Sequence, residues 1–199
     1  MLVHYDRSRR RLLKWSAASA AGVALSGVIM PNFGISAALA ADLGEGDVGV
    51  LNYAYALEQL EAAFYTMVVD SPYADINDDE KAILTDIRDH EVEHRDFLKE
   101  ALAAGAIPDL EVDFSAVDFT SRDSVLGTAM VFEDLGVGAY NGAGKLLENA
   151  DYLLNMNSVS FAGDDVVDKN GLDVAYAPTE VLPKADPFIK TDVTANAFM

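Results

Sequence analysis

The sequence predicts an all-α fold, and three observations support that prediction. First, three segments place apolar residues at alternating steps of three and four, which is the spacing of a buried helix face. Second, helix-breaking residues separate these segments, at Ser71–Pro72 and at Gly105 ahead of Pro108. Third, the absence of cysteine excludes disulfide frameworks, iron–sulfur clusters and zinc ribbons. The 199 residues are enough for one domain with a hydrophobic core.

Residues 1–40 have the features of a cleaved export signal. A basic stretch, Ser8–Lys14, precedes the apolar run Trp15–Met30, and residues 38–40 (ALA) offer a cleavage site. The paired arginines of the basic stretch resemble those of twin-arginine signals. The apolar run is short for a membrane-spanning helix, although an uncleaved membrane anchor is the alternative. We therefore expect a periplasmic or otherwise extracytoplasmic protein, without stable membrane insertion after cleavage.

The mature chain is expected to be strongly acidic. The full sequence has a formal charge of −19, and cleavage after Ala40 would remove Asp6 and five basic residues, which changes the charge to −23. Such a surface repels nucleic acid and anionic lipid, and it attracts cations. The same acidic composition is equally typical of a protein whose solvated surface is suited to a saline habitat. We therefore expect no nucleic-acid partner.

Two helices are expected in the first part of the mature chain. The first begins near Asp47, a good N-cap residue, and ends at about Val69, before the Ser71–Pro72 break. The second opens at the acidic cluster Asn77–Glu80, which suits the positive end of a helix dipole, and it ends at Gly105.

A third helix is expected after a long linker. Residues 108–119 exceed the usual connection in a helical bundle, so the later part of the chain can cross over the first two helices. The third helix starts near Ser121 and contains glycines that weaken it but permit close helix contact. These are Gly127, Gly136, Gly138 and Gly142.

The helical pattern then weakens. Lys145–Leu154 is expected to form a short fourth helix, and from Asn155 onward glycines and prolines break any long one. A single helical turn is expected at Thr179–Leu182. The sequence thus predicts a bundle over residues 44–154 and a largely irregular tail, residues 155–199, packed on it.

Each of the three long helices carries a carboxylate in its apolar stripe, where a leucine would be expected. The stripes are Leu51, Tyr55, Glu58, Ala62 and Tyr65, then Leu84, Ile87, Glu91, His94, Leu98 and Ala101, then Leu126, Met130, Glu133, Val137 and Tyr140. A bare carboxylate in an apolar interior costs several kcal/mol, so the cluster calls for a partner. A metal ion bound by Glu58, Glu91, His94 and Glu133 is the simplest one.

The Glu-x-x-His step at Glu91 and His94 gives this prediction its chemistry. A spacing of three residues puts both side chains on one helix face, within reach of a single ion. Carboxylate oxygen combined with imidazole nitrogen suits iron, manganese or zinc better than magnesium or calcium. An exposed or internally satisfied Glu/His pair is the alternative, because both residues are common on helix surfaces.

The remaining polar residues near the stripes are interpreted separately. Tyr65 and Tyr140 each follow a stripe glutamate by seven residues, so their hydroxyls can support a metal-bound carboxylate, or they are ordinary core tyrosines. Glu61 and Glu93 point away from the stripes and are expected to be solvated. His90 also lies off the stripe, and we expect a supporting or surface position.

Three stretches resemble the ferritin-like domain proteins, in particular the exported bacterial branch related to plant desiccation-associated proteins: LEQLEAAFY at 57–65, HEVEH at 90–94 and FEDLGVGAY at 132–140. The resemblance implies an antiparallel four-helix bundle with a di-iron or di-manganese site. In such a site two helices give one glutamate each, and the other two give Glu-x-x-His. Glu58 matches the first-helix ligand, Glu91 and His94 the second-helix pair, and Glu133 the third-helix ligand.

The second Glu-x-x-His that the resemblance implies is missing. At the offset of 75 residues that separates Glu58 from Glu133, it would fall at Val166 and Lys169, and no histidine follows His94. The sequence therefore predicts a reduced metal site. It would hold one ion, or it would be completed by a homodimer in which each subunit contributes its first-half ligands.

Three functions fit these observations. The protein could bind iron or manganese and take part in an oxidative-stress or desiccation-related response. It could instead be a metal-free, degenerate ferritin-like protein of the stress response or the cell envelope. The third reading is an acidic envelope protein whose tail contacts a partner. No serine–histidine–acid grouping, phosphate-binding glycine loop or basic groove supports another enzyme class.

Overall fold

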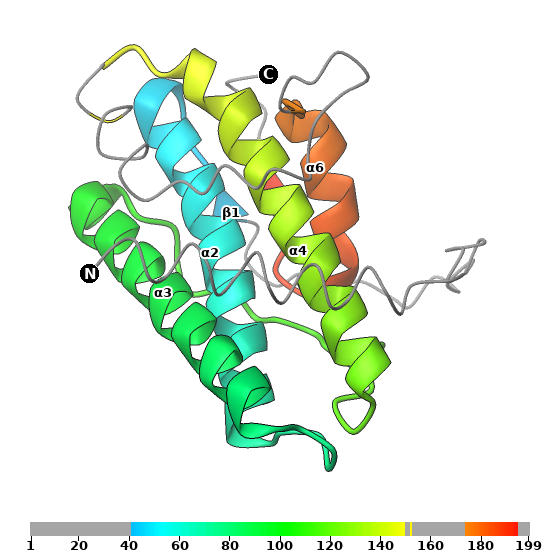
Figure 1. Cartoon of the computed structure of the whole chain (residues 1–199). Coiled ribbons are helices and arrows are strands. Elements are labelled where there is room, and N and C mark those ends of the chain that lie inside the picture. The colour runs from blue at the N-terminus through cyan, green and yellow to red at the C-terminus, as the bar shows by residue number, and fades with distance from the viewer. Residues whose placement is uncertain (1–40, 150–151, 153–173, 195–199) are drawn as a thin grey trace.

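The computed structural model describes residues 41–149, 152 and 174–194, and three long helices dominate this part of the chain (Figure 1). They are α2 (Gly46–Asp70), α3 (Asp78–Leu102) and α4 (Arg122–Ala143). In Figure 1, α2 lies between α3 and α4 and runs antiparallel to both. The all-α prediction is confirmed, whereas the predicted export signal at residues 1–40 lies outside the described residues.

Helix α2 is the central helix of the fold, because it is buried on nearly all sides. Its buried residues run almost without a break from Gly49 to Tyr65. The predicted N-cap was two residues late, since Glu45 is the N-cap and Asp47 lies in the first turn. The Asp47 carboxylate instead accepts hydrogen bonds from the backbone N–H groups of Glu148 and Asn149, at 2.7 and 3.0 Å, and so ties the end of the α4 region to α2.

Helix α3 is amphipathic, as its stripe predicted. The Asn77 side chain caps it by accepting a hydrogen bond from the Glu80 N–H at 2.9 Å. One position in the predicted stripe is wrong: Ala101 is exposed, and Leu102 is buried in its place. The helix ends there because Ala103 takes a positive φ of 49°, and a short 3₁₀ turn, η1 (Ala103–Gly105), follows.

An ion pair between the buried Glu80 and the half-buried Arg122 joins the N-terminal ends of α3 and α4. Glu80 is 1% exposed, and its carboxylate accepts hydrogen bonds from Arg122, at 2.9 Å from Nε and also from a terminal guanidinium nitrogen. The Tyr73 hydroxyl donates a third hydrogen bond to Glu80, at 2.9 Å. These donors compensate the buried charge and fix how the two helices start relative to each other.

Two polar side chains of α2 hold the start of the α3–α4 linker. Asn52 donates to the carbonyls of Leu43 and Gly105 and accepts from the N–H of Ile107. About two turns further, Gln59 accepts from the N–H of Leu110 at 2.7 Å. The predicted crossover therefore runs along α2 before it reaches α4, with its backbone groups satisfied by buried amides.

Aromatic rings fill the space between α2, the linker and α4. Phe64 of α2 meets Phe132 of α4 edge to face, with ring centroids 5.1 Å apart, and it also packs on Phe114 of the linker at 5.8 Å. Phe188 of the C-terminal segment closes the group against Phe132 at 5.0 Å. This cluster sets the spacing at which α4 crosses α2.

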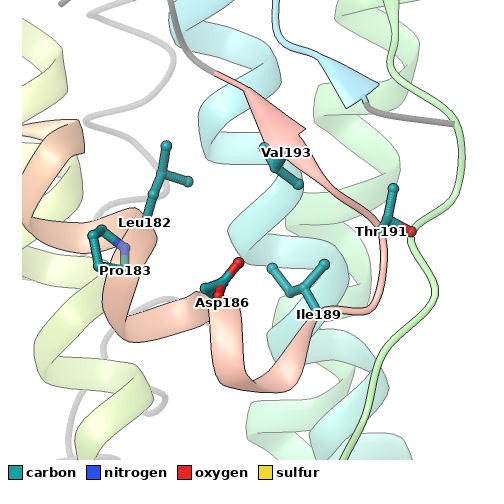
Figure 2. A pocket seen from close by; sticks show the side chains of 6 residues that line it. All are labelled: Leu182, Pro183, Asp186, Ile189, Thr191 and Val193. Atoms are coloured by element: carbon teal, nitrogen blue, oxygen red, sulfur yellow. The ribbon is translucent and has the colours of Figure 1, made fainter. Parts of the chain in front are cut away.

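The C-terminal segment, residues 174–194, is more regular than predicted. It contains α6 (Pro178–Ala185), the 3₁₀ turn η3 (Asp186–Phe188) and β2 (Val193–Thr194), which pairs in parallel with β1 (Ala41–Asp42). The expected single turn is thus a two-turn helix, with Pro178 in its first turn and the Glu180 carboxylate accepting from the Ala177 N–H at 2.8 Å. Figure 1 shows α6 beside α4, and Figure 2 shows a shallow hollow that this segment lines with Leu182, Pro183, Asp186, Ile189, Thr191 and Val193.

Glycines of α4 let the C-terminal segment approach its backbone. The Tyr176 N–H donates to the Gly138 carbonyl at 2.8 Å, and a β-carbon at Gly142 would lie only 1.7 Å from the Tyr176 carbonyl oxygen. At Gly138 and Gly142 the close contact expected from the glycines is therefore made with the tail rather than with another long helix. Of the predicted helix Lys145–Leu154, residues 145–149 hold the end of the 3₁₀ turn η2 (Gly144–Leu146), Tyr152 is helical, and the other residues lie outside the described part of the chain.

No helix in the described ranges combines the length and the apolar character needed to cross a lipid bilayer.

Candidate metal centre

Glu58 lies in the middle of α2 with its carboxylate inside the fold. The residue is 2% exposed, and the helix around it is buried on nearly every side. One carboxylate oxygen, Oε2, lies 3.2 Å from Nδ1 of His94 on α3. The other, Oε1, accepts a hydrogen bond from the Tyr140 hydroxyl of α4 at 2.5 Å. Glu58 thus connects the three long helices at one point.

Glu91 and His94 approach Glu58 from α3. Glu91 is 1% exposed and His94 is 6% exposed, so the predicted burial of both residues is correct. Nδ1 of His94 lies 3.1 Å from Oε2 of Glu91, as the spacing of three residues on one helix face requires. Two carboxylates and one imidazole therefore meet in the interior between α2 and α3.

The protonation of this cluster follows from burial and mutual charge. Burial raises the pKa of Glu58 to about 7, although the neighbouring His94 opposes that shift. Burial lowers the pKa of His94, but the carboxylates of Glu58 and Glu91 outweigh it and raise the pKa to about 10. In the metal-free protein His94 is therefore the internal cation that compensates the buried carboxylates.

Glu61 belongs to the same cluster, which corrects the expectation that it is solvated. It is 7% exposed, and one of its oxygens would lie 3.0 Å from a β-carbon at Gly136 of α4. The periodic pattern missed it because that pattern assumes one buried face, whereas α2 is covered on several sides. The feature of the sequence that could have indicated the burial of Glu61 is Gly136, because a glycine on α4 leaves room for a carboxylate from α2. Glu93 is exposed, as expected.

His90 also lies at the cluster. Its residue is half-buried, its ring centroid is 3.7 Å from that of His94, and its Nδ1 lies 3.4 Å from Oε1 of Glu91. Ligand atoms of His90, Glu91 and His94 all lie within 4.8 Å of one another, and the same holds for Glu58, Glu61 and Glu91. Glu91 is common to both groups.

Glu133, the fourth predicted ligand, is placed differently. It is half-buried and accepts a hydrogen bond from the Tyr65 hydroxyl at 2.8 Å. Among the described residues it belongs to neither of the two ligand groups. The third predicted stripe is only partly buried, because α4 turns Phe132 and Leu135 into the core and leaves Met130, Glu133 and Val137 half-buried.

The two tyrosines pair with glutamates across the α2–α4 contact. Tyr65 of α2 binds Glu133 of α4, and Tyr140 of α4 binds Glu58 of α2. Each tyrosine follows the glutamate of its own helix by seven residues, so the antiparallel packing brings both pairs into register. Burial raises the pKa of Tyr140 well above its usual value, and the charges of Glu58, Glu61 and Glu91 add to the shift, so this hydroxyl stays a donor.

A comparison with protein families matches residues 46–160 to the ferritin-like domain, which is more than half of the chain. The chain belongs to the ferritin-like domain family. A comparison with curated proteins gives no match. In this ferritin-like protein the residues predicted to match the family's first ligands, Glu58, Glu91 and His94, come together from α2 and α3. The positions expected for the second Glu-x-x-His are Val166 and Lys169, which lie outside the described residues and have no such side chains.

The donor set of this ferritin-like domain fits a transition-metal ion. Carboxylate oxygen and imidazole nitrogen are the ligands that iron, manganese and zinc accept together. Ligand atoms on opposite sides of one such ion lie about 4 Å apart, given metal–ligand distances near 2.1 Å. Both groups, each within 4.8 Å, need only a small contraction to reach that separation.

Proposed function

We propose that this ferritin-like protein binds iron or manganese through Glu58, Glu91 and His94. One observation carries the proposal: two helices bring two buried carboxylates to within 3.2 Å of the same imidazole nitrogen. Glu133 has less support as a ligand, since its carboxylate lies outside both groups and holds the Tyr65 hydroxyl. The bound metal would supply one-electron chemistry towards O₂ or peroxide.

The residues of the chain prepare this site in three ways. Burial of Glu58, Glu91 and His94 keeps bulk water away from the ligands. The Tyr140 hydroxyl holds one oxygen of Glu58, which leaves the other directed at His94. Because His94 carries a proton in the metal-free protein, metal uptake must release that proton, and binding becomes stronger as the pH rises.

Features of the sequence support a proposal for the location and role of the protein. The signal features of residues 1–40 support export, and the twin-arginine route accepts proteins that are already folded around a cofactor. The acidic surface favours the accumulation of cations around the exported protein. We propose a role in oxidative stress or desiccation outside the cytoplasm, as in the ferritin-like branch that the sequence resembles.

Metal content tests the proposal directly. The full chain is expressed, the exported protein is purified, and its metal content is measured after anaerobic loading with iron(II) or manganese(II). We expect at least one equivalent in the wild type and none in Glu91→Ala. Glu93→Ala, an exposed change on the same helix, is the matched control and should keep the metal. A wild type that stays metal-free after loading refutes the proposal.

A metal-free function is the second candidate, and one observation favours it. His94 already compensates the carboxylates of Glu58 and Glu91, so the cluster can exist without an ion. In that case Glu91→Ala leaves a buried imidazolium with less compensation and destabilises the protein, with or without added metal. Thermal unfolding of the wild type in a chelator and in manganese(II) separates the two candidates, because only a metal-binding protein is stabilised by the ion.

A further inference from the structure

We propose that one chain binds two metal ions, and that His90 and Glu61 supply ligands in place of the missing Glu-x-x-His pair. The inference rests on the metal-binding function proposed above. It arises from the two ligand groups, His90–Glu91–His94 and Glu58–Glu61–Glu91, which overlap only at Glu91. Neither His90 nor Glu61 matches a ligand position of the family pattern, so both are additional donors that α2 and α3 contribute.

His90 is positioned as a second imidazole ligand. It precedes His94 by four residues, so both rings project from one side of α3, and their centroids are 3.7 Å apart. The two rings are inclined at 65°, and Nδ1 of His90 faces Glu91 at 3.4 Å rather than turning into solvent. In the two-metal sites of this fold the second imidazole comes from another helix. Here α3 supplies both.

Glu61 is positioned as an additional carboxylate ligand. It follows Glu58 by three residues on α2, and it is 7% exposed in a helix whose surroundings are largely apolar. Gly136 of α4 leaves the space that this carboxylate occupies. The ligand atom of Glu61 lies within 4.8 Å of those of Glu58 and Glu91, so three buried carboxylates meet at one point of the interior.

Glu91 is placed to serve both positions. Its Oε1 faces His90 at 3.4 Å, and its Oε2 faces His94 at 3.1 Å, so its two oxygens are directed at different members of the cluster. A carboxylate whose oxygens point to different partners can bridge two ions. The five residues together offer three carboxylates and two imidazoles, which is enough for two ions that share one ligand.

Native mass spectrometry tests the inference, because it counts metal ions per chain and chains per particle in one measurement. The full exported protein is loaded anaerobically with manganese(II). We expect two ions in a monomeric particle of the wild type and one in His90→Gln and in Glu61→Gln. Both changes remove a ligand while nearly preserving size. Glu93→Gln, which makes the same change as Glu61→Gln at an exposed position, should keep two ions.

Electron paramagnetic resonance provides a second readout. Two manganese(II) ions that share Glu91 are magnetically coupled, so the wild type should give a broadened spectrum, and either ligand variant should give the spectrum of an isolated ion. Circular dichroism of the variants confirms that the helices are retained.

The outcomes separate this inference from the proposed function. If the wild type binds one ion that Glu91→Ala removes, the proposed function stands and the two-ion inference is wrong. The inference is also overturned if both ligand variants keep two ions, or if the second ion is found only in a dimeric particle, because the partner subunit then completes the site. A wild type without any metal overturns both proposals.

Discussion

The Tyr140 hydroxyl is expected to strengthen metal binding, and Tyr140→Phe removes it without changing the ring. The lost hydrogen bond is 2.5 Å long and ends on Glu58, which is 2% exposed, so water cannot readily replace the donor. Hydrogen bonds to charged groups contribute about 1.5–3 kcal/mol. Loss of a group that orients a metal ligand weakens metal affinity roughly 10- to 100-fold, which corresponds to about 1.4–2.8 kcal/mol. The two magnitudes agree.

Titration with manganese(II) in competition with a chelator measures this effect. Tyr55→Phe is the matched control, because the buried Tyr55 is also a tyrosine of a long helix, but its hydroxyl donates to Asp109 of the linker at 3.3 Å rather than to Glu58. We expect its affinity to equal that of the wild type. If Tyr140→Phe binds manganese as tightly as Tyr55→Phe, the hydroxyl does not orient Glu58 for the ion, and the reasoning is refuted.

Three further predictions concern stability. In the metal-free protein the carboxylates of Glu58 and Glu91 outweigh burial and raise the His94 pKa from 6.5 to about 10. The stabilisation that the His94 charge provides is therefore complete below pH 6.5 and is lost as the pH rises through 10. The melting temperature in chelator should fall over this pH range, and His94→Gln should make it less dependent on pH. Arg122→Ala leaves the carboxylate of Glu80 buried with less compensation of its charge. Denaturant titrations should show an unfolding free energy lower by about 3 kcal/mol. A loss below about 1 kcal/mol, which is the range of a surface ion pair, would contradict the buried role of Glu80. Gly142→Ala forces a β-carbon against a backbone oxygen of the tail, so it should destabilise the protein by about 1–3 kcal/mol and speed up proteolysis of the tail. Gly127→Ala places its β-carbon in open space and should stabilise the protein by about 0.5–1 kcal/mol. Equal effects of the two substitutions on the unfolding free energy would refute the close contact at Gly142.

The sequence determined the local structure and the first half of the site. The starts of α3 and α4 were predictable because Asn77 and Ser121 cap them with their own side chains. The pairing of Glu91 with His94 was predictable because a helix fixes the direction of residues three apart. Glu58 could be placed with them because a carboxylate in an apolar stripe needs a partner, and this physical requirement is visible in the pattern.

Tertiary packing decided the remaining ligands and contacts. Glu61 is buried because α4 leaves room for its carboxylate at Gly136. Tyr65 of α2 reaches Glu133 of α4, and Tyr140 of α4 reaches Glu58 of α2, because the two helices are antiparallel and in register. The tail docks on Gly138 and Gly142, which the sequence had assigned to contact between helices. Periodicity describes one face of one helix, whereas these contacts depend on the angle and offset at which two helices meet. Those quantities are set by the packing of the whole core, so only the assembled fold reveals them.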